Sequence, residues 1–471
     1  MLFNSFEFLL FFPIVTILFF LLPHNLRWIL LLIASCIFYC YFIPVYLLIL
    51  IFIILVDYFA GILIEDSKRY KKWWLIASIT ANLGILSVFK YFNFFIANFN
   101  VVFGTAAPLL NVILPIGLSF HTFQAMSYTI ELYKGAIKAE RHIGIYALYV
   151  LFYPQLVAGP IERPQNILPQ IHKKQRFSAT NLLNGLRLFT WGFFKKLVIA
   201  DNLSKYVDMV YSNPHLYHWL TVMIAIFLFS IQIYCDFSGY TDIARGAAKV
   251  MGFNLMINFN RPLMAKTIRE FWQRWHISLS SWFRDYIYIP LGGNRKGIAK
   301  KIWYTILVFA LSGFWHGAGF NFIIWGLLHA LFLIAGFLFF KSRKLNFKKI
   351  QLKLVGIIFI NFLVAYSFVF FRNSSINHSL EIIYASFDFN TSSHFSLAIN
   401  DYNGQLGIAH YSIDPILLFI VFMFLFEWKT DASLEKMNNY KWPDILWFVV
   451  MILSIIFWGV FTKETFIYFQ F

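Results

Sequence analysis

Long apolar segments constrain the fold of this chain more than any motif does. Residues 45–64 are twenty almost uninterrupted apolar positions, and similar segments cover 6–22 and 27–43. A helix needs about 20 apolar residues to cross the ~30 Å hydrocarbon core of a bilayer. Because 60% of the residues are hydrophobic and only 13% are charged, the composition excludes an ordinary soluble domain. The sequence predicts an all-α polytopic membrane protein.

The length of 471 residues sets the expected number of crossings. It allows about ten to twelve transmembrane helices. We also expect re-entrant or interfacial helices around a central cavity or tunnel, because irregular backbone at membrane depth must face protein or water. The first apolar segment has no basic leader and no small-residue cleavage site after it, so we expect a permanent span.

The basic residues are grouped in short runs between apolar segments. The net charge of +17 could indicate nucleic-acid binding, but no large basic surface is available to hold a duplex. The positive-inside bias explains the runs better and predicts that they are cytoplasmic, which places the N-terminus outside. These runs are residues 68–72, 172–176, 294–301 and 341–349.

The three cysteines are too few and too scattered for a disulfide framework or a thiolate metal site. They are Cys36, Cys40 and Cys235. We expect no bound metal.

The stretch "LSGFWHGAGF", residues 311–320, places His316 inside an apolar hairpin between two basic runs. Its first arm, 302–315, has 14 residues, or about 21 Å of helix. This length predicts a glycine-rich turn within the membrane, and hence a cavity at His316. Ser312 lies four residues earlier on the same helical face. Alternatively, His316 only forms hydrogen bonds between packed helices and Ser312 only packs there, and neither lines a cavity.

A second histidine lies in residues 267–295, which carry too many charges to span a membrane but repeat apolar residues at helical spacing. This pattern predicts one amphipathic helix along a membrane face or over a cavity. His276 lies at the edge of the apolar stripe. The stripe comprises Ile268, Phe271, Trp272, Trp275, Leu279, Trp282 and Phe283.

These segments resemble the membrane-bound O-acyltransferase family, and most closely its bacterial alginate O-acetyltransferase branch. The two diagnostic blocks are "EFWQRWHISLSSWFRDYIYIPLGGNR" and "LSGFWHGAGFNFIIWGLLHAL". Further blocks in the same order are "MLFNSFEFLLFF", "PIGLSFHTFQAMSYTIELYKG", "YPQLVAGPIERP", "IQIYCDFSGYTDIARG", "NFNRPL" and "FIYFQF". The branch that transfers D-alanine to teichoic acids is similar in architecture, and its acyl donor is attached to a carrier protein.

The resemblance implies a single integral membrane domain over residues 1–471. It would comprise N-terminal helices in 1–100, a catalytic core in 110–340 and C-terminal helices in 341–471. His316 matches the catalytic histidine of the family, and His276 matches its partner position. Histidine suits general-base catalysis because its ordinary pKa is about 6.5.

The resemblance also implies an acyl donor, acetyl-coenzyme A or an acyl carrier, which arrives from the cytoplasm of a bacterial cell with no permanently bound cofactor. We expect Ser312, Trp272 and Arg274 to contact this donor. Arg269, Arg295 and Lys296 are further basic residues near the expected entrance, where ordinary positive-inside residues are the alternative. The acceptor would be an extracytoplasmic polysaccharide. It could be reached through a separate transferase of the serine-hydrolase-like SGNH type.

Two other functions fit the same sequence. A transporter or flippase also places histidines in the membrane, although no internal repeat supports one. The chain could instead be a membrane subunit of a polysaccharide-modifying complex with no activity of its own.

Overall fold

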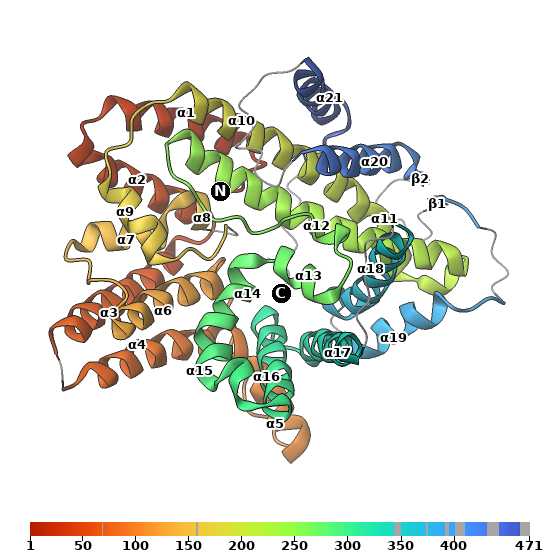
Figure 1. Ribbon diagram of the computed structural model, residues 1–471, viewed down its shortest axis with the longest axis horizontal. Helices are drawn as coiled ribbons and strands as arrows, with labels where there is room; N and C mark the ends of the chain where they lie inside the picture. Colours follow the sequence, from red (N-terminus) through yellow and green to blue (C-terminus); the bar gives the residue numbers. More distant parts are fainter. Residues whose placement is uncertain are drawn as a thin grey trace. The chain divides into compact units, whose positions relative to one another are not determined.

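The structure is a computed structural model, and it confirms the all-helical class of a polytopic membrane protein. It describes residues 1–67, 69–156, 159–342, 350–373, 375–390, 395–400, 410–430 and 442–461. The only strands in this part of the chain are β1 (Ala398–Asn400) and β2 (His410–Ser412), which pair antiparallel. In Figure 1 the colours of the helices follow the chain, from red at the N-terminus to blue at the C-terminus.

The described chain forms two compact units. Unit 1 comprises Met1–Phe189 and Tyr240–Ile257, and unit 2 comprises Thr190–Gly239 and Asn258–Phe471. The boundaries fall inside α10 (Ala179–Phe193) and α12 (Trp219–Val250). The expected single membrane domain and its three parts stay a prediction.

Unit 1 contains helices that bury one side and expose the other, such as α2 and α3, and helices that are buried over most of their length, such as α6 and α7. Its helices are α1 (Phe6–Leu21), α2 (His24–Cys40), α3 (Leu47–Asp66), α4 (Lys71–Leu86), α5 (Phe92–Phe103), α6 (Leu118–Lys134), α7 (Ile143–Leu151), α8 (Tyr153–Leu156) and α9 (Pro164–His172). A 3-10 turn, Pro44–Tyr46, precedes α3, and a π-helical turn, Ser87–Tyr91, joins α4 to α5. The first three apolar segments of the sequence thus become α1 to α3. Figure 1 shows α3 beside α4 and α6, and these helices are in contact.

Unit 2 holds both predicted histidines. After a π-helical turn, Phe194–Ala200, its helices are α11 (Asp201–Ser212), α13 (Ile268–Arg274), α14 (Ile277–Phe283), α15 (Ile289–Leu291), α16 (Ile298–His316), α17 (Phe320–Ser342), α18 (Ile350–Arg372), α19 (Ile376–Ala385), α20 (Asp414–Lys429) and α21 (Trp442–Trp458). Short 3-10 turns cover Pro214–Leu216, Pro262–Met264 and Gly293–Lys296, and a π-helical turn covers Arg284–Tyr288.

Six helical segments in the described part are long and apolar enough to cross a membrane. They are Pro44–Asp66, Lys71–Phe103, Trp219–Val250, Ile298–His316, Phe320–Phe339 and Gln351–Arg372. Three shorter apolar helices are Phe6–Leu21, His24–Cys40 and Ile445–Trp458. Many of their exposed side chains are large and apolar, such as Ile358 of α18, which is 68% exposed. Side chains of this kind suit contact with lipid. The expected ten to twelve crossings exceed these six segments and stay a prediction.

Helices α16 and α17 form the hairpin that the sequence predicted, and glycines let them approach closely. A Cβ atom on Gly313 would lie 2.1 Å from the Phe322 carbonyl oxygen, and one on Gly326 would lie 2.1 Å from the Phe309 carbonyl oxygen. Only a residue without a side chain fits either position. Small residues bring membrane helices together in this way.

Two details of the prediction are wrong. Helix α16 begins at Ile298 and has 19 residues, so it is about 28 Å long and not a short 14-residue arm. The predicted continuous helix over 267–295 is interrupted between α13 and α14. The predicted stripe itself is a buried surface, with Phe271, Trp275 and Leu279 each 1% exposed.

Candidate active site

The interruption between α13 and α14 occurs at His276. This residue has φ 42° and ψ 54°, in the left-handed region, which is unfavourable for a residue with a side chain. A distant segment holds the backbone there, because Asn260 N donates to the Arg274 carbonyl and Ile277 N donates to the Asn258 carbonyl. Strained backbone of this kind is concentrated at functional sites.

The side chain of Asn258 orients the His276 ring. Asn258 is completely buried, and its Oδ1 lies 3.2 Å from His276 Nδ1 while it accepts a 2.9 Å bond from Ser278 Oγ. Since Oδ1 is only an acceptor, His276 Nδ1 carries the proton, and the ring lone pair is on Nε2. Burial lowers the pKa of His276 to about 3, so the ring is neutral near pH 7.

His316 is the last residue of α16, and its ring lies close to that of His276. The two ring centroids are 6.2 Å apart. The edges and faces of Trp325 and Phe371 surround the His316 imidazole, each with its ring centroid 5.2 Å away. His316 is 4% exposed and His276 is 1% exposed. The two histidines therefore share a dry aromatic environment in unit 2.

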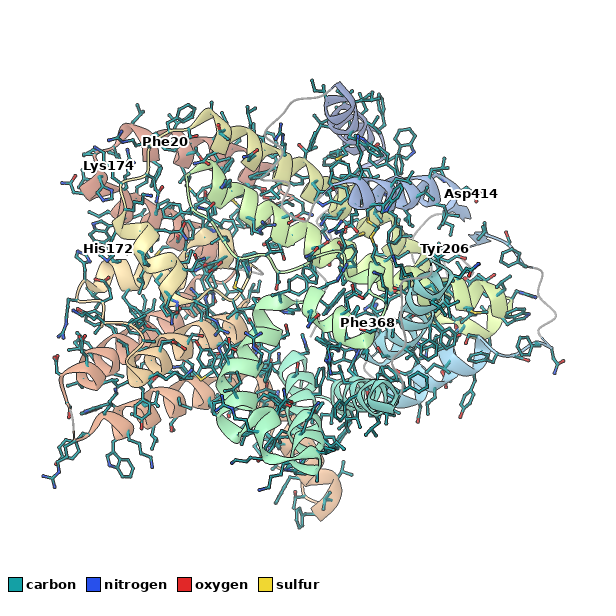
Figure 2. All side chains as sticks on the ribbon, viewed as in Figure 1. Phe20, His172, Lys174, Tyr206, Phe368 and Asp414 are labelled. Carbon is teal, nitrogen blue, oxygen red and sulfur yellow. The ribbon has the colours of Figure 1, made fainter. Side chains whose placement is uncertain are left out.

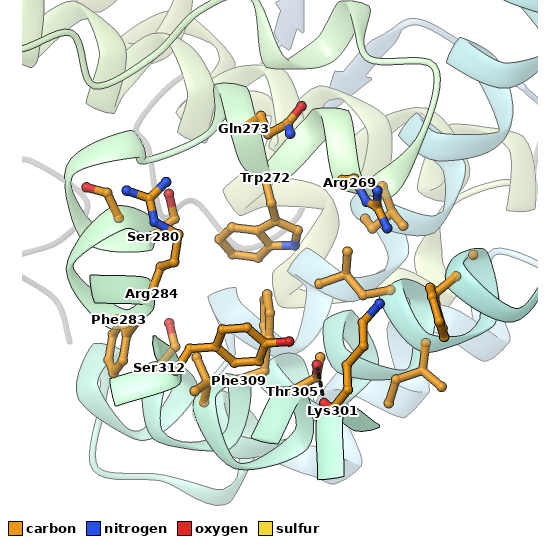
Figure 3. A pocket seen from close by; sticks show the side chains of 18 of the residues that line it. Arg269, Trp272, Gln273, Ser280, Phe283, Arg284, Lys301, Thr305, Phe309 and Ser312 are labelled. Atoms are coloured by element: carbon orange, nitrogen blue, oxygen red, sulfur yellow. Dashed lines mark hydrogen bonds between the residues drawn. The ribbon is translucent and has the colours of Figure 1, made fainter. Parts of the chain in front are cut away.

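A cavity of about 1000 Å³ lies beside this pair within unit 2 (Figure 3). Its lining comes from α13, α14, the turn after α14, α16 and α17. Polar or charged residues of the lining are Thr267, Arg269, Gln273, Ser280, Ser281, Arg284, Tyr288, Asn294, Lys301, Thr305 and Ser312. The rest of the lining is mainly apolar. Such a surface suits a ligand with a charged end and an apolar or uncharged body.

Three cationic side chains line the cavity. Arg269 and Arg284 are exposed, and Figure 3 shows Arg269 and Lys301 on one side of Trp272 and Arg284 on the other. The Lys301 ammonium lies 3.3 Å from the centre of the Phe337 ring. Arg284 Nε also contacts Asp285 Oδ1 at 2.7 Å. These cations give the cavity a positive potential that attracts anionic ligands.

Trp272 connects the cavity to the histidines through an aromatic series. Its ring centroid is 5.9 Å from that of Trp325, which in turn is 5.2 Å from that of His316. The buried Trp272 Nε1–H has no hydrogen-bond acceptor among the described residues. A buried donor without an acceptor is costly.

The predicted site residues are only partly brought together. Ser312 and Trp272 line the cavity, whereas His276 and His316 are not among its lining residues. Ser312 lies one helical turn before His316. Arg274 is also outside the lining, and its Nη2 lies 2.6 Å from Glu270 Oε1. The roles assigned to these five residues stay predictions.

Some residues of the site were not assigned from the sequence. The sequence places Lys301 only in the basic run 294–301 and Arg284 only in the charged segment 267–295, although both line the cavity. Asn258 lies in the block "NFNRPL". This block supports the family resemblance, but the sequence assigns no role to Asn258. Its proximity to His276 depends on a contact between segments 18 residues apart, which helical or strand periodicity does not reveal.

Comparison with known proteins gives one family over this region. The family model described as MBOAT, membrane-bound O-acyltransferase family, matches residues 141–376. This range includes both histidines and every residue that lines the cavity.

Curated relatives extend the similarity over most of the chain. A peptidoglycan O-acetyltransferase of Helicobacter pylori is 34% identical, with 94% of this chain and 91% of the relative covered. A probable alginate O-acetylase of Pseudomonas putida is 38% identical over 71% of this chain and 70% of the relative. A teichoic acid D-alanyltransferase of Bacillus subtilis is 29% identical over 58% of this chain and 72% of the relative. The chain thus belongs to the membrane-bound O-acyltransferase family and is an O-acyltransferase.

Proposed function

We propose that this O-acyltransferase moves an acetyl group from cytoplasmic acetyl-coenzyme A toward hydroxyl groups of an extracytoplasmic polysaccharide, with His316 as the general base. One observation carries the proposal: two buried imidazoles, His276 and His316, have ring centroids 6.2 Å apart. His316 lies one helical turn after Ser312, which lines the large cationic cavity. The names of the relatives support acetyl transfer, since two of the three describe O-acetylation.

The cavity suits a long thioester donor. Arg269, Arg284 and Lys301 would attract the phosphates of coenzyme A. The uncharged arm would follow the apolar wall toward Ser312, with the Trp272 N–H as a hydrogen-bond donor. A volume of about 1000 Å³ is at the upper end of the range for small-molecule sites, as a ligand of this size requires.

Transfer requires that the acceptor hydroxyl lose its proton as it attacks the thioester carbonyl. In the proposed reaction His316 takes this proton, the new C–O bond forms, and the C–S bond breaks. The coenzyme A thiolate that leaves recovers a proton from the His316 imidazolium. General-base assistance of this kind contributes roughly 10² to 10⁴ in rate. His276, held neutral by burial and oriented by Asn258, would position the thioester.

The position of His316 along α16 supports a reaction between two compartments. It follows Lys301 by fifteen residues, about 22 Å along the helix axis, within the ~30 Å hydrocarbon thickness. If Lys301 lies at the cytoplasmic surface, His316 lies well inside the membrane. Because His316 does not line the cavity, the wall between Ser312 and His316 must open when the donor binds.

The proposal extends to location and partners. We place the chain in the bacterial cytoplasmic membrane with the N-terminus outside, because the basic runs then face the cytoplasm. The acetyl group could pass directly to the polymer or first to a separate extracytoplasmic SGNH-type transferase. A carrier-bound acyl donor is the alternative that the D-alanyltransferase relative favours.

Membranes that contain the full chain, supplied with radiolabelled acetyl-coenzyme A and acceptor polysaccharide, test the proposal. The native protein should release free coenzyme A, and His316→Ala should lower this rate by about 10² or more. The matched control is His378→Ala on the surface helix α19, which should retain the native rate. Equal rates for His316→Ala and the native protein would reject the assignment of His316. If the membranes consume an acyl-carrier donor and not acetyl-coenzyme A, acetyl-coenzyme A would be rejected as the donor.

A further inference from the structure

Two residues of the described chain other than glycine have a left-handed backbone conformation, and they lie on the two sides of one backbone pairing. They are His276, with φ 42°, and Arg261, with φ 50° and ψ 54°. Residues 258–261 pair with residues 274–277 through two backbone hydrogen bonds. In addition, Arg274 Nη1 donates to the Arg261 carbonyl oxygen at 3.4 Å. The proposed reaction uses His276, but it assigns no task to Arg261.

The backbone conformation of Arg261 is unfavourable for two reasons. A residue with a Cβ atom is strained in the left-handed region. The next residue is Pro262, and a proline favours an extended conformation in the residue before it. Strained backbone of this kind persists only where the surrounding structure holds it. Asn258 supplies the contacts that hold His276, so the contacts that hold Arg261 are the next question.

The guanidinium of Arg261 contacts the end of α20. Its Nη1 donates to the carbonyl oxygens of Glu427 at 3.0 Å and Thr430 at 3.1 Å. The last carbonyls of a helix have no partner within the helix, and a cation beside them is favourable. Figure 2 labels Asp414, where this helix begins. The strained segment therefore caps a helix whose contacting residues lie 166 and 169 positions later in the chain.

The end of α20 is itself held in place within unit 2. Glu427 is 5% exposed, and its Oε1 accepts a 2.5 Å hydrogen bond from the Tyr234 hydroxyl of α12. The Tyr234 ring packs near Phe259 and Trp275, one from each side of the pairing, with ring centroids 6.0 and 6.3 Å away. Arg261 thus connects the strained segment to a buried anchor that also packs against the pairing.

We propose that Arg261 is a positioning residue for the acetyl transfer. Its contact with the end of α20 fixes residues 258–261, and this segment presents Asn258 to the His276 ring. Arg261 is not among the residues that line the donor cavity, so it acts on the rate through this segment. The role of Arg261 rests on the proposed function, but its structural step can be measured without any substrate.

Hydrogen–deuterium exchange of the purified full chain in detergent tests the structural step. The donors of the pairing are the N–H groups of Asn260 and Ile277. In Arg261→Ala, peptides that cover 258–264 and 274–280 should exchange about tenfold faster, because the segment loses its anchor. Peptides from α17 should keep the native exchange. Unchanged exchange in both peptides would overturn the proposal, and faster exchange over the whole chain would show a general stabilising role instead.

The matched control is Lys429→Ala. Lys429 is an exposed basic residue in the last turn of the same helix, and its ammonium lies 5.8 Å from the centre of the Trp447 ring. This variant removes a positive charge from the end of α20 and should exchange as the native chain does. Equal changes in Lys429→Ala and Arg261→Ala would show that charge at the helix end, and not the contact of Arg261, protects the pairing.

Arg261→Gly separates the guanidinium from the backbone conformation. Glycine adopts the left-handed region without strain but has no side chain to cap α20, so the same two peptides should again exchange faster. Arg261→Lys keeps a cation that can reach a helix carbonyl but lacks the planar guanidinium, and it should restore part of the protection. Native exchange in Arg261→Gly would overturn the role of the guanidinium.

Coenzyme A release from acetyl-coenzyme A connects this contact to the rate. Arg261→Ala should lower kcat about tenfold and leave KM near the native value. In the Asn258→Ala background the same substitution should have little further effect, because both residues act through one segment. Fully additive losses would overturn the positioning role. If the native chain releases no coenzyme A, the proposed function fails, and the exchange measurement alone decides whether Arg261 holds the pairing.

Discussion

At the scale of residues, the site depends on one strained histidine and the asparagine that holds it. His276 has φ 42°, and its backbone and side chain both contact Asn258. Ile277 N donates to the Asn258 carbonyl, and Asn258 Oδ1 contacts His276 Nδ1. The tautomer and the orientation of His276 thus depend on a residue that the proposed reaction does not otherwise use. In the proposed reaction, Asn258 would act as a positioning residue.

Replacing Asn258 should reduce turnover without weakening donor binding. In Asn258→Ala the His276 ring loses the acceptor that fixes its tautomer, and the lost buried hydrogen bond corresponds to about a tenfold loss of rate. We expect kcat to fall and KM for acetyl-coenzyme A to stay near the native value, measured by coenzyme A release.

The control for this variant is Asn260→Ala. Asn260 contributes its backbone N–H to the same pairing, and alanine retains that group, so this variant should behave as the native chain. A rise in KM with native kcat for Asn258→Ala would contradict the positioning role.

At the scale of elements, the hairpin of α16 and α17 sets the position of His316. Gly313 and Gly326 let the two backbones meet, because a Cβ on either would lie 2.1 Å from a backbone oxygen of the partner helix. Asn321 at the start of α17 also donates to the Asn373 carbonyl after α18. His316, the proposed general base, therefore lies at the end of a closely packed helix pair.

Gly326→Ala should separate α16 from α17 and displace His316. We expect a cost of about 1 to 3 kcal/mol, as for other overpacked positions, with a lower melting temperature in detergent and lower turnover. Gly319→Ala is the matched control in the same hairpin, since its Cβ would meet nothing closer than 3.5 Å. Equal melting temperatures for both variants would contradict the close packing.

The elements also show what local patterns can predict. Helical spacing correctly identified a buried face in 267–295, because burial of Phe271, Trp275 and Leu279 follows from their own positions. It did not predict the break at His276, since no proline or glycine lies within residues 267–289 and the cause is hydrogen bonding to residues 258–260. The start of α16 was placed four residues late because Lys300 and Lys301 were read as loop, although lysines commonly lie at the ends of membrane helices.

At the scale of the whole molecule, hydrogen bonds gather several basic segments at one end of unit 1. Arg141 contacts Asp66 and Glu65 at the end of α3. His172 at the end of α9 contacts His24 at the start of α2 through its carbonyl oxygen. Glu140, the neighbour of Arg141, lies 2.6 Å from His172 Nε2, so the C-terminal ends of α3 and α9 lie at the same end of unit 1. The positive-inside bias requires this if the basic runs that follow both helices are cytoplasmic.

Cysteine labelling tests this orientation. Lys71→Cys and Lys174→Cys, each on the native background of three cysteines, should react with a membrane-impermeant maleimide only after the cells are permeabilised. The unsubstituted chain gives the background labelling. Labelling of either cysteine in intact cells would place this end of unit 1 outside and contradict the proposed topology.

The most direct measurement for the central claim is an experimental structure with a non-hydrolysable thioether analogue of acetyl-coenzyme A. The phosphates should lie against Arg269, Arg284 and Lys301, the arm should pass Trp272 and Ser312, and the acyl carbon should lie within reach of both His316 and His276. An analogue bound outside the cavity, or one whose acyl end stops at Ser312 with both histidines still enclosed, would contradict the account.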